Sequence, residues 1–324
     1  MTNYIATYFY HDSEDQGASY GNIFLPLIER NIIYWQTVYT FFFSSIVQNK
    51  KSEISYALFT NVVAFPFRDS IEALGVKIYD DLFLTQRNPD KWATVKFFFD
   101  VIDYIYENNE FKDDDGFVIL DTDVVALGCA KPLFDCLQAS KNAVAYVFEE
   151  LSDNSRDFHG VNISDLEKIG LSAFGKETNI KSLIGGEFFC FNKRHISKLI
   201  NCFKIFNNPN YSTQITTEEQ ILTLLNTQES WAKFPEGIYR VWTTLRLFDL
   251  PQENLNYIFL HLPSEKEFGL KKLFNATKNI DPNSMEESDF SLLFYRYLPL
   301  NRPYFLFVSK IISKIRSIIR PKYL

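Results

Sequence analysis

Two aspartates end one of the most apolar segments of the 324-residue chain. The segment Phe117-Val-Ile-Leu is followed by Asp121, Thr122 and Asp123, and glycines stand at positions 116 and 128. Apart from these three residues the segment 117–128 is apolar, which predicts a strand buried on both faces. Aspartate is a poor strand former, so its presence there needs a reason. Because carboxylates removed from water need partners, the pair indicates a Mg²⁺ or Mn²⁺ site or a cap on the next segment.

A histidine and a lysine farther along the chain can complete such a site. His261 ends the apolar segment Leu255-Asn-Tyr-Ile-Phe-Leu, and Lys266 follows it closely. A neutral imidazole can share a divalent ion with two carboxylates, and a lysine adds positive charge for phosphate oxygens. A histidine at a strand end can equally be an ordinary buried side chain. The metal hypothesis therefore depends on whether His261 reaches Asp121 and Asp123.

A second group of polar residues could transfer protons or stabilise charge. Its members are Glu187, which follows the pair Gly185-Gly186, and Glu218, Glu219 and Gln220, which begin a helix predicted over 217–226. Carboxylates can take a proton from a hydroxyl group or stabilise a developing positive charge. The alternatives are structural, because acidic residues at a helix start are favourable with the helix dipole and a glycine pair can form a bulge.

Two tyrosines, Tyr8 and Tyr10, lie at the end of the first predicted strand. Their rings could stack on a nucleobase, since every base offers a π-face. Aromatic residues make up 17% of the chain, with 32 Phe and 18 Tyr, so both can equally be packing residues. The sequence leaves these two roles open.

Strands and helices are predicted to alternate along the chain. Strands are predicted at 3–10, 54–63, 76–79, 117–128, 143–148, 182–192 and 255–261, and helices at 27–48, 69–74, 91–107, 193–206 and 217–226. This order favours an α/β fold with a mostly parallel central sheet, in which ligands bind at the carboxyl ends of the strands. The polar stretch 151–181 is predicted to be an irregular surface or lid segment.

Composition excludes several classes of protein. The net charge is −7, and residues 301–324 contain six basic and no acidic residues, so the first 300 residues carry −13. An acidic body argues against nucleic-acid binding. The four cysteines have no metal-binding spacing, which indicates a reducing compartment, and we find neither a signal-peptide pattern nor an apolar stretch that could span a bilayer.

The basic end of the chain is predicted to form an amphipathic helix. Ile311, Ile312, Ile315, Ile318 and Ile319 share one helical face, and Lys310 and Lys314 lie on the other. Such a helix binds anionic membrane surfaces through its basic residues and its apolar face. We therefore expect residues 304–320 to place the protein peripherally on the cytoplasmic face of a membrane. The alternative is a helix that packs on the core of the protein.

Together these motifs resemble the GT-A-fold nucleotide-sugar glycosyltransferases, in particular the family of glycogenin and the lipopolysaccharide galactosyltransferases. The Asp-x-Asp ends a mid-sheet strand, Glu219-Gln220 is similar to the acidic-Gln helix start, and His261 with Lys266 resembles the family's His-x-x-Gly-x-x-Lys element. Ser264 stands at the glycine position of that element, and Glu219 stands where the family has Asp.

The resemblance implies one GT-A (Rossmann-like) domain over 1–275 and a helical C-terminal extension over 276–324. It implies a metal held by Asp121, Asp123 and His261, with Lys266 on the diphosphate, and catalytic roles among Glu187, Glu218, Glu219 and Gln220. Gly185 and Gly186 would build the sugar and acceptor side. The implied reaction moves a sugar, most simply from a UDP-sugar and with retention, to a glycan or lipid-linked glycan acceptor in surface polysaccharide synthesis.

Two alternatives remain from the sequence. An apolar strand ending in Asp-x-Asp also occurs in phosphatases of the haloacid dehalogenase type, where Asp121 would be the nucleophile. That class needs a later strand with a paired acidic motif, which we do not find after residue 140. The other alternative is a non-catalytic peripheral membrane module.

Overall fold

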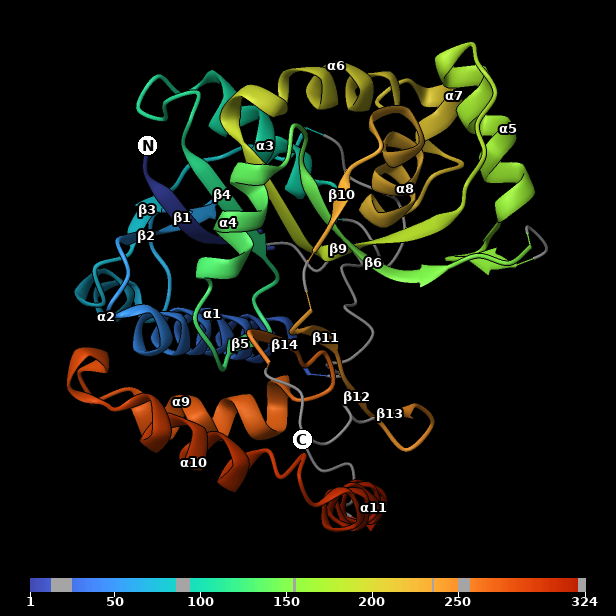
Figure 1. Ribbon diagram of the computed structural model, residues 1–324. Coiled ribbons are helices and arrows are strands. Elements are labelled where there is room, and N and C mark those ends of the chain that lie inside the picture. Colours follow the sequence, from blue (N-terminus) through green and yellow to red (C-terminus); the bar gives the residue numbers. More distant parts are fainter. Residues whose placement is uncertain (13–24, 86–93, 154–155, 235, 250–256, 320–324) are drawn as a thin grey trace.

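The computed structural model in Figure 1 describes residues 1–12, 25–85, 94–153, 156–234, 236–249 and 257–319. Its centre is a seven-stranded sheet with the order β10-β6-β9-β4-β1-β2-β3. The strands are β1 (Asn3–Phe9), β2 (Ile54–Thr60), β3 (Lys77–Tyr79), β4 (Gly116–Leu120), β6 (Val144–Glu150), β9 (Ser182–Asn192) and β10 (Ala232–Lys233). All neighbouring pairs are parallel except those of β9, which runs antiparallel to β4 and β6. The predicted α/β class with a mostly parallel sheet is confirmed.

Helices cover both faces of this sheet, as Figure 1 shows. On one face lie α3 (Phe97–Glu107), α6 (Ser197–Ile205) and α8 (Glu218–Glu229), and on the other lie α1 (Leu27–Asn49) and α4 (Lys131–Ala139). Beneath α1, α9 (Lys271–Thr277) and α10 (Glu287–Tyr297) form a further layer. The side chains of β4 alternate between the two cores, because Phe117 and Ile119 pack with one cluster and Val118 and Leu120 with the other. This burial on both sides explains why the strand is apolar throughout.

The segment predicted as one strand over 117–128 forms two strands in two sheets. After β4 ends at Leu120, the chain passes through the Asp-x-Asp and continues as β5 (Val124–Ala126). That strand belongs to a small sheet with β14 (Phe259–His261) and β11 (Ile238–Arg240), in which His261 pairs with Val124. Leu262 also donates its N–H to the Asp123 carbonyl at 3.0 Å. The two aspartates therefore sit at the junction of the sheets, and strand register brings His261 to them.

The segment 151–181, predicted to be irregular, is instead largely regular. It contains β7 (Asp157–Phe158), β8 (Val161–Asn162) and α5 (Ile163–Phe174). Asn162 caps this helix by accepting the Ser164 N–H at 3.0 Å, and Gly175 ends it in the left-handed conformation, with φ 68°. The prediction that this segment is irregular was wrong because these stop and start signals outweigh the polar composition.

The remaining elements complete the chain. They are α2 (Arg68–Ala73), α7 (Pro209–Ser212), β12 (Trp242–Thr243), β13 (Phe248–Asp249), the π-helical turn Lys266–Leu270, the 3₁₀ turns Lys193–His195 and Pro282–Ser284, and α11 (Pro303–Ile319). The start of the helix predicted over 91–107 and of the strand predicted over 255–261 lie outside the described residues. The boundary predicted at residue 275 falls within α9, which packs on α1 through Tyr39 and Phe274 with ring centroids 5.3 Å apart.

Helix α11 forms the lower end of the molecule in Figure 1. Its first half packs on the protein, since Leu306 is buried and the Phe307 ring meets Phe248 edge-on at 5.2 Å. Its isoleucines at 311, 312 and 315 remain exposed, so the alternative of complete packing on the core is wrong for this part of the helix. Within the described residues, every helix is too short or too polar to cross a membrane.

Candidate functional site

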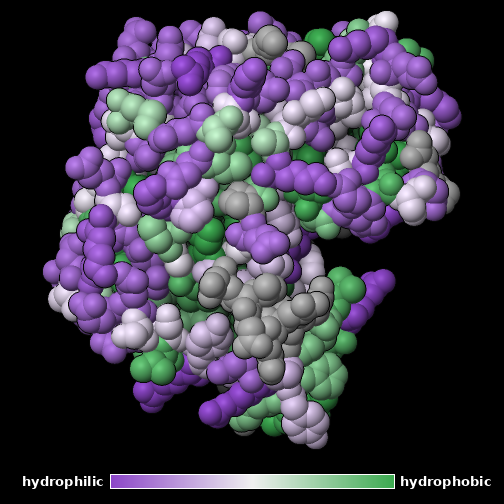
Figure 2. Space-filling model, in the orientation of Figure 1, coloured by the Kyte–Doolittle hydropathy of each residue, from purple (hydrophilic) through white to green (hydrophobic). Residues whose placement is uncertain are grey.

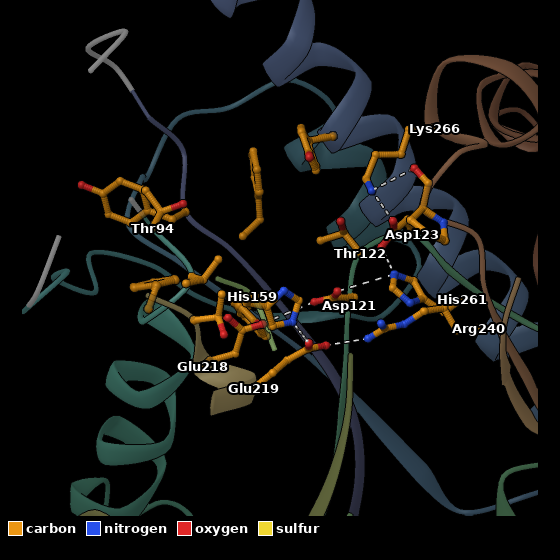
Figure 3. Close-up of a pocket in the computed structure, with 18 of the residues that line it drawn as sticks. Thr94, Asp121, Thr122, Asp123, His159, Glu218, Glu219, Arg240, His261 and Lys266 are labelled. Carbon is orange, nitrogen blue, oxygen red and sulfur yellow. Dashed lines mark hydrogen bonds and ion pairs between the residues drawn. The ribbon is translucent and has the colours of Figure 1, made fainter. Parts of the chain in front are cut away.

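A pocket of about 260 Å³ opens where β1 and β4 end. It is lined by most of the residues that the sequence singles out: Tyr8, Tyr10, Asp121, Asp123, Glu218, Glu219, His261 and Lys266. Figure 3 shows how the acidic and basic members of this set face one another. Four predicted residues, Gly185, Gly186, Glu187 and Gln220, do not line the pocket. The chemistry predicted for the carboxyl edge of the sheet is therefore concentrated in one cavity.

Asp121, Asp123 and His261 form the part of the pocket suited to a metal ion. The Nε2 atom of His261 lies 3.2 Å from Asp123 Oδ1 and 3.6 Å from Asp121 Oδ2, and one ligand atom of each residue lies within 4.8 Å of the others. Neighbouring ligands of an octahedral ion with bonds of about 2.1 Å stand roughly 3 Å apart. Two carboxylates and one imidazole at these separations fit a Mg²⁺ or Mn²⁺ ion.

The charges of this group are balanced by nearby cations. Lys266 forms an ion pair with Asp123 (Figure 3). Burial alone raises the pKa of Asp123, but Lys266 and His261 outweigh it and hold that pKa well below its usual range. Burial and the neighbouring Asp123 raise the pKa of Asp121 to about 6. For His261, burial lowers the pKa, but Asp123 and Glu187 raise it to about 9. A metal ion must therefore displace a proton from His261, because only the neutral ring binds metal.

A second charged group is centred on Arg240, from β11. Its guanidinium donates to both oxygens of Glu187, at 2.5 and 2.6 Å, and to Glu219 Oε1 at 2.5 Å. Glu187 is almost fully buried, and burial alone raises its pKa, but Arg240 and His261 reverse the shift and lower it. The second oxygen of Glu219 is paired with His159. Glu187 and Glu219 are thus held ionised by a largely buried arginine, whose side chain is 18% exposed.

Glu218 differs from its neighbours because it has no counter-charge. Its Oε2 atom is buried and finds no hydrogen-bond partner among the described residues. Burial and the nearby Glu219 and Asp121 raise the pKa of Glu218 well above its usual value. Such an orphaned polar atom in a pocket wall is costly unless a ligand uses it. Glu218 is consequently the acidic residue of the pocket best suited to act on a bound molecule.

The glycine pair provides space for these glutamates. A Cβ at Gly186 would come within 2.5 Å of Glu218 Oε1, and one at Gly185 within 2.2 Å of Glu187 Oε2. The Gly186 N–H also points to Glu219 Oε1 at 3.3 Å. Gly185 and Gly186 therefore support the pocket from behind and do not line it.

Gln220 holds the start of α8 in place. Its side-chain oxygen accepts the N–H groups of Thr216 and Thr217, at 2.8 and 3.2 Å, and its amide donates to the Phe158 carbonyl at 2.8 Å. The Thr217 hydroxyl accepts the Gln220 N–H in return, which completes a capping box. Gln220 has no exposed surface and does not line the cavity. This differs from the catalytic role that the family resemblance implies for it.

The tyrosines line the pocket and also pack against the core. The Tyr8 hydroxyl lies 3.5 Å from Asp121 Oδ1, while its ring packs against Phe97 and Phe98. The Tyr10 ring meets Phe97 edge-on at 5.3 Å. Both rings therefore form an aromatic wall at the end of the pocket next to β1, and the two roles left open by the sequence are compatible.

The sequence interpretation missed Arg240, His159 and Trp242, all of which line the pocket. Arg240 stands in the apolar run Ile-Tyr-Arg-Val-Trp, where a buried arginine requires acidic partners. His159 and Gly160 form the two-residue turn between β7 and β8, with φ of 54° and 85°. Such a turn is predictable from its glycine, but the contact with Glu219 is tertiary.

Comparison with known proteins identifies the fold. No family model and no curated protein matches the sequence. Among solved structures, the chain resembles the bifunctional glycosyltransferase WbbM with a TM-score of 0.55 and 12% identity, over 91% of this chain and 51% of that one. It is similar to the galactosyltransferase LgtC, solved with donor and acceptor sugar analogues, with a TM-score of 0.49 and 12% identity, over 91% and 96% of the two chains.

A third similar structure is the glycosyltransferase GlyE of Streptococcus pneumoniae TIGR4, with a TM-score of 0.46 and 13% identity, over 92% of this chain and 64% of that one. The chain thus spans about half of WbbM and just under two thirds of GlyE. At such identities the likeness to WbbM bears on the fold alone. The chain therefore has the GT-A glycosyltransferase fold, as its motifs predicted.

Proposed function

We propose that the protein is a metal-dependent glycosyltransferase that moves a sugar from a nucleotide-diphosphate donor, a UDP-sugar, to a glycan or lipid-linked glycan in surface polysaccharide synthesis. The observation that carries the proposal is the convergence of Asp121, Asp123 and His261 in one pocket with Lys266 beside them. A GT-A fold raises the expectation, and it disfavours the dehalogenase-type phosphatase, whose motif opens a different domain. Because one fold can carry many reactions, the residues of the site determine the chemistry.

Different residues of the pocket are proposed to bind different parts of the donor. Asp121, Asp123 and His261 would hold Mn²⁺ or Mg²⁺, which supplies Lewis-acid stabilisation of the departing diphosphate. Lys266 adds a positive charge for the same phosphate oxygens. Tyr8 and Tyr10 offer rings for the nucleobase.

Glu218 is the proposed residue on the sugar. Its unpaired, partly buried carboxyl lies in the pocket wall beside Glu219 and Asp121. Its raised pKa favours the protonated form, in which it would donate a hydrogen bond to the sugar. In its ionised form it would stabilise positive charge at the anomeric carbon. Glu219 is fixed by Arg240 and His159 and is proposed to orient sugar hydroxyls.

Donor hydrolysis tests this proposal directly. We expect slow release of UDP from a UDP-sugar with Mn²⁺, and loss of that release with EDTA or in Asp123→Ala. A thermal shift with UDP and Mn²⁺, absent with p-nitrophenyl phosphate, would exclude the phosphatase. Binding of UDP without any turnover would favour the non-catalytic module. Activity indifferent to both EDTA and Asp123→Ala would refute the metal assignment.

We also propose that α11 attaches the protein to the cytoplasmic face of a membrane. The observation that supports this is the exposure of Phe305, Ile311, Ile312 and Ile315 on α11, at the lower end of the molecule, where Figure 2 shows hydrophobic surface. Exposed patches of this kind mark interaction sites. We expect flotation with anionic vesicles and not with phosphatidylcholine vesicles, and loss of flotation when the three isoleucines become serine. Unchanged flotation of that variant would refute the proposal.

A further inference from the structure

The buried carboxylate of Glu265 does not line the pocket but joins three elements of the structure. Its Oε1 atom accepts the Thr243 hydroxyl of β12 and lies 2.5 Å from Lys310 Nζ of α11, and its Oε2 atom accepts the Gly269 N–H at 3.1 Å. Only 2% of Glu265 is exposed. The Glu265 carboxylate thus contacts β12, the π-helical turn Lys266–Leu270 and α11 at the same time.

Two of these elements carry residues of the proposed donor site. Trp242, next to Thr243, lines the pocket, and Lys266, next to Glu265, lines it and pairs with Asp123. The turn that follows Glu265 is tightly packed, because a Cβ at Gly269 would come within 2.3 Å of the Leu298 side chain. The position of Lys266 is therefore set by the turn that Glu265 caps.

The counter-charge of Glu265 comes from α11. Lys310 is largely buried, its ammonium lies 4.2 Å from the centre of the Phe268 ring, and it also donates to the Ser264 carbonyl at 3.4 Å. The sequence predicts Lys310 to lie on the solvated basic face, so this placement corrects that expectation. Without Lys310, Glu265 would be a buried carboxylate with only neutral donors, which is strongly unfavourable.

We infer that Glu265 and Lys310 are positioning residues for the donor diphosphate, so that the attachment of α11 to the body sets the place of Lys266 in the pocket. This inference rests on the proposed function. An unpaired carboxylate one residue before Lys266 competes with Asp123 and the donor phosphates for that ammonium. The helix proposed to lie on the membrane is thereby linked to Lys266 through the ion pair of Lys310 with Glu265.

The test compares nucleotide binding with metal binding in the full chain. In Lys310→Met we expect the Kd for UDP in the presence of Mn²⁺, measured by calorimetry, to rise about tenfold. Losses of this size are typical when a residue that orients a binding group is replaced. The affinity for Mn²⁺ alone, measured by electron paramagnetic resonance, should not fall, because a Lys266 ammonium drawn away from Asp123 competes less with the ion for that carboxylate. General damage to the fold would lower both affinities.

Two further variants and a control complete the test. Lys310→Arg keeps the charge and should restore UDP affinity, as should the double variant Glu265→Gln/Lys310→Met, which removes both charges. Lys51→Met breaks an exposed ion pair with Glu287 and should leave both affinities unchanged. Wild-type affinity for UDP in Lys310→Met, or equal losses of UDP and Mn²⁺ affinity, would overturn the inference. A wild-type protein that binds no UDP with Mn²⁺ would instead refute the proposed function.

Discussion

Replacing Arg240 with methionine should destabilise the protein far more than the loss of an ordinary surface ion pair. Arg240 is the shared partner of Glu187 and Glu219, whose side chains are 1% and 9% exposed. Methionine keeps much of the volume and removes the charge. Both carboxylates would then remain in a pocket wall without their cation, and burial would raise their pKa values.

The size of the effect follows from these contacts. Removing one partner of a buried ion pair costs about 3–5 kcal/mol. With an unfolding entropy of about 2.1 cal/mol/K per residue, a chain of 324 residues has about 0.7 kcal/mol/K. The melting temperature should therefore fall by about 4–7 °C.

Differential scanning calorimetry without metal or nucleotide measures this change. Arg194→Met is the matched control, because Arg194 pairs with Asp114 at the surface and these side chains are 54% and 62% exposed. That control should cost less than about 1 kcal/mol. The triple variant Arg240→Met/Glu187→Gln/Glu219→Gln should recover much of the loss. Equal stability of the Arg240 and Arg194 variants, or no recovery in the triple variant, would refute the reasoning.

Three further predictions concern single side chains. Glu218→Gln should lower kcat for donor hydrolysis by about a hundredfold while leaving the melting temperature unchanged or higher, since an unpaired buried carboxyl is removed; full activity would contradict its proposed role. Gln220→Ala should lower stability by about 1–2 kcal/mol through the lost capping box and leave the KM for the donor unchanged, which urea unfolding and kinetics can check. Burial raises the pKa of Asp100 to about 6, so the native state binds the proton of this carboxyl more tightly than the unfolded state does. The free energy of unfolding therefore decreases as the pH rises from about 4 to about 6. Asp100→Asn should therefore be more stable than the wild type by about 1–2 kcal/mol at pH 7, after allowance for partial exposure, and the gain should disappear below about pH 4 in urea titrations.

The main strands were predictable because strands that are buried in the structure are apolar in sequence. β4 faces a core on each side, so all of its residues are apolar, and its end at the aspartates is visible in the sequence. The missed helix α5 has only one buried side. Its buried residues, Ile163, Leu166 and Ile169, recur at helical spacing between an Asn cap and a Gly stop, so the signal was present beneath a polar composition.

The site was predictable to the extent that its residues end strands. Asp121 follows the end of β4 at the carboxyl edge of the large sheet, where such residues collect. His261 reaches it because β14 pairs with β5 in the small sheet, and Lys266 lies in the turn after β14. The contacts of Arg240 with Glu187 and Glu219 depend instead on how the small sheet packs against the large one, and no local pattern specifies that. The same holds for Lys310. Its position on the polar face of the helix predicted an exposed side chain, but the tertiary contact with Glu265 leaves it largely buried.

His261 connects the two charged groups of the pocket. Its Nε2 atom faces Asp121 and Asp123, and its Nδ1 atom lies 3.4 Å from Glu187 Oε1. A carboxylate beside Nδ1 favours the tautomer with the proton on that atom, which leaves Nε2 free for a metal ion. Arg240 keeps Glu187 ionised and in place for this role. The arginine therefore acts on the metal group through Glu187 and His261, so its replacement should weaken Mn²⁺ affinity even though it contacts none of the three ligands.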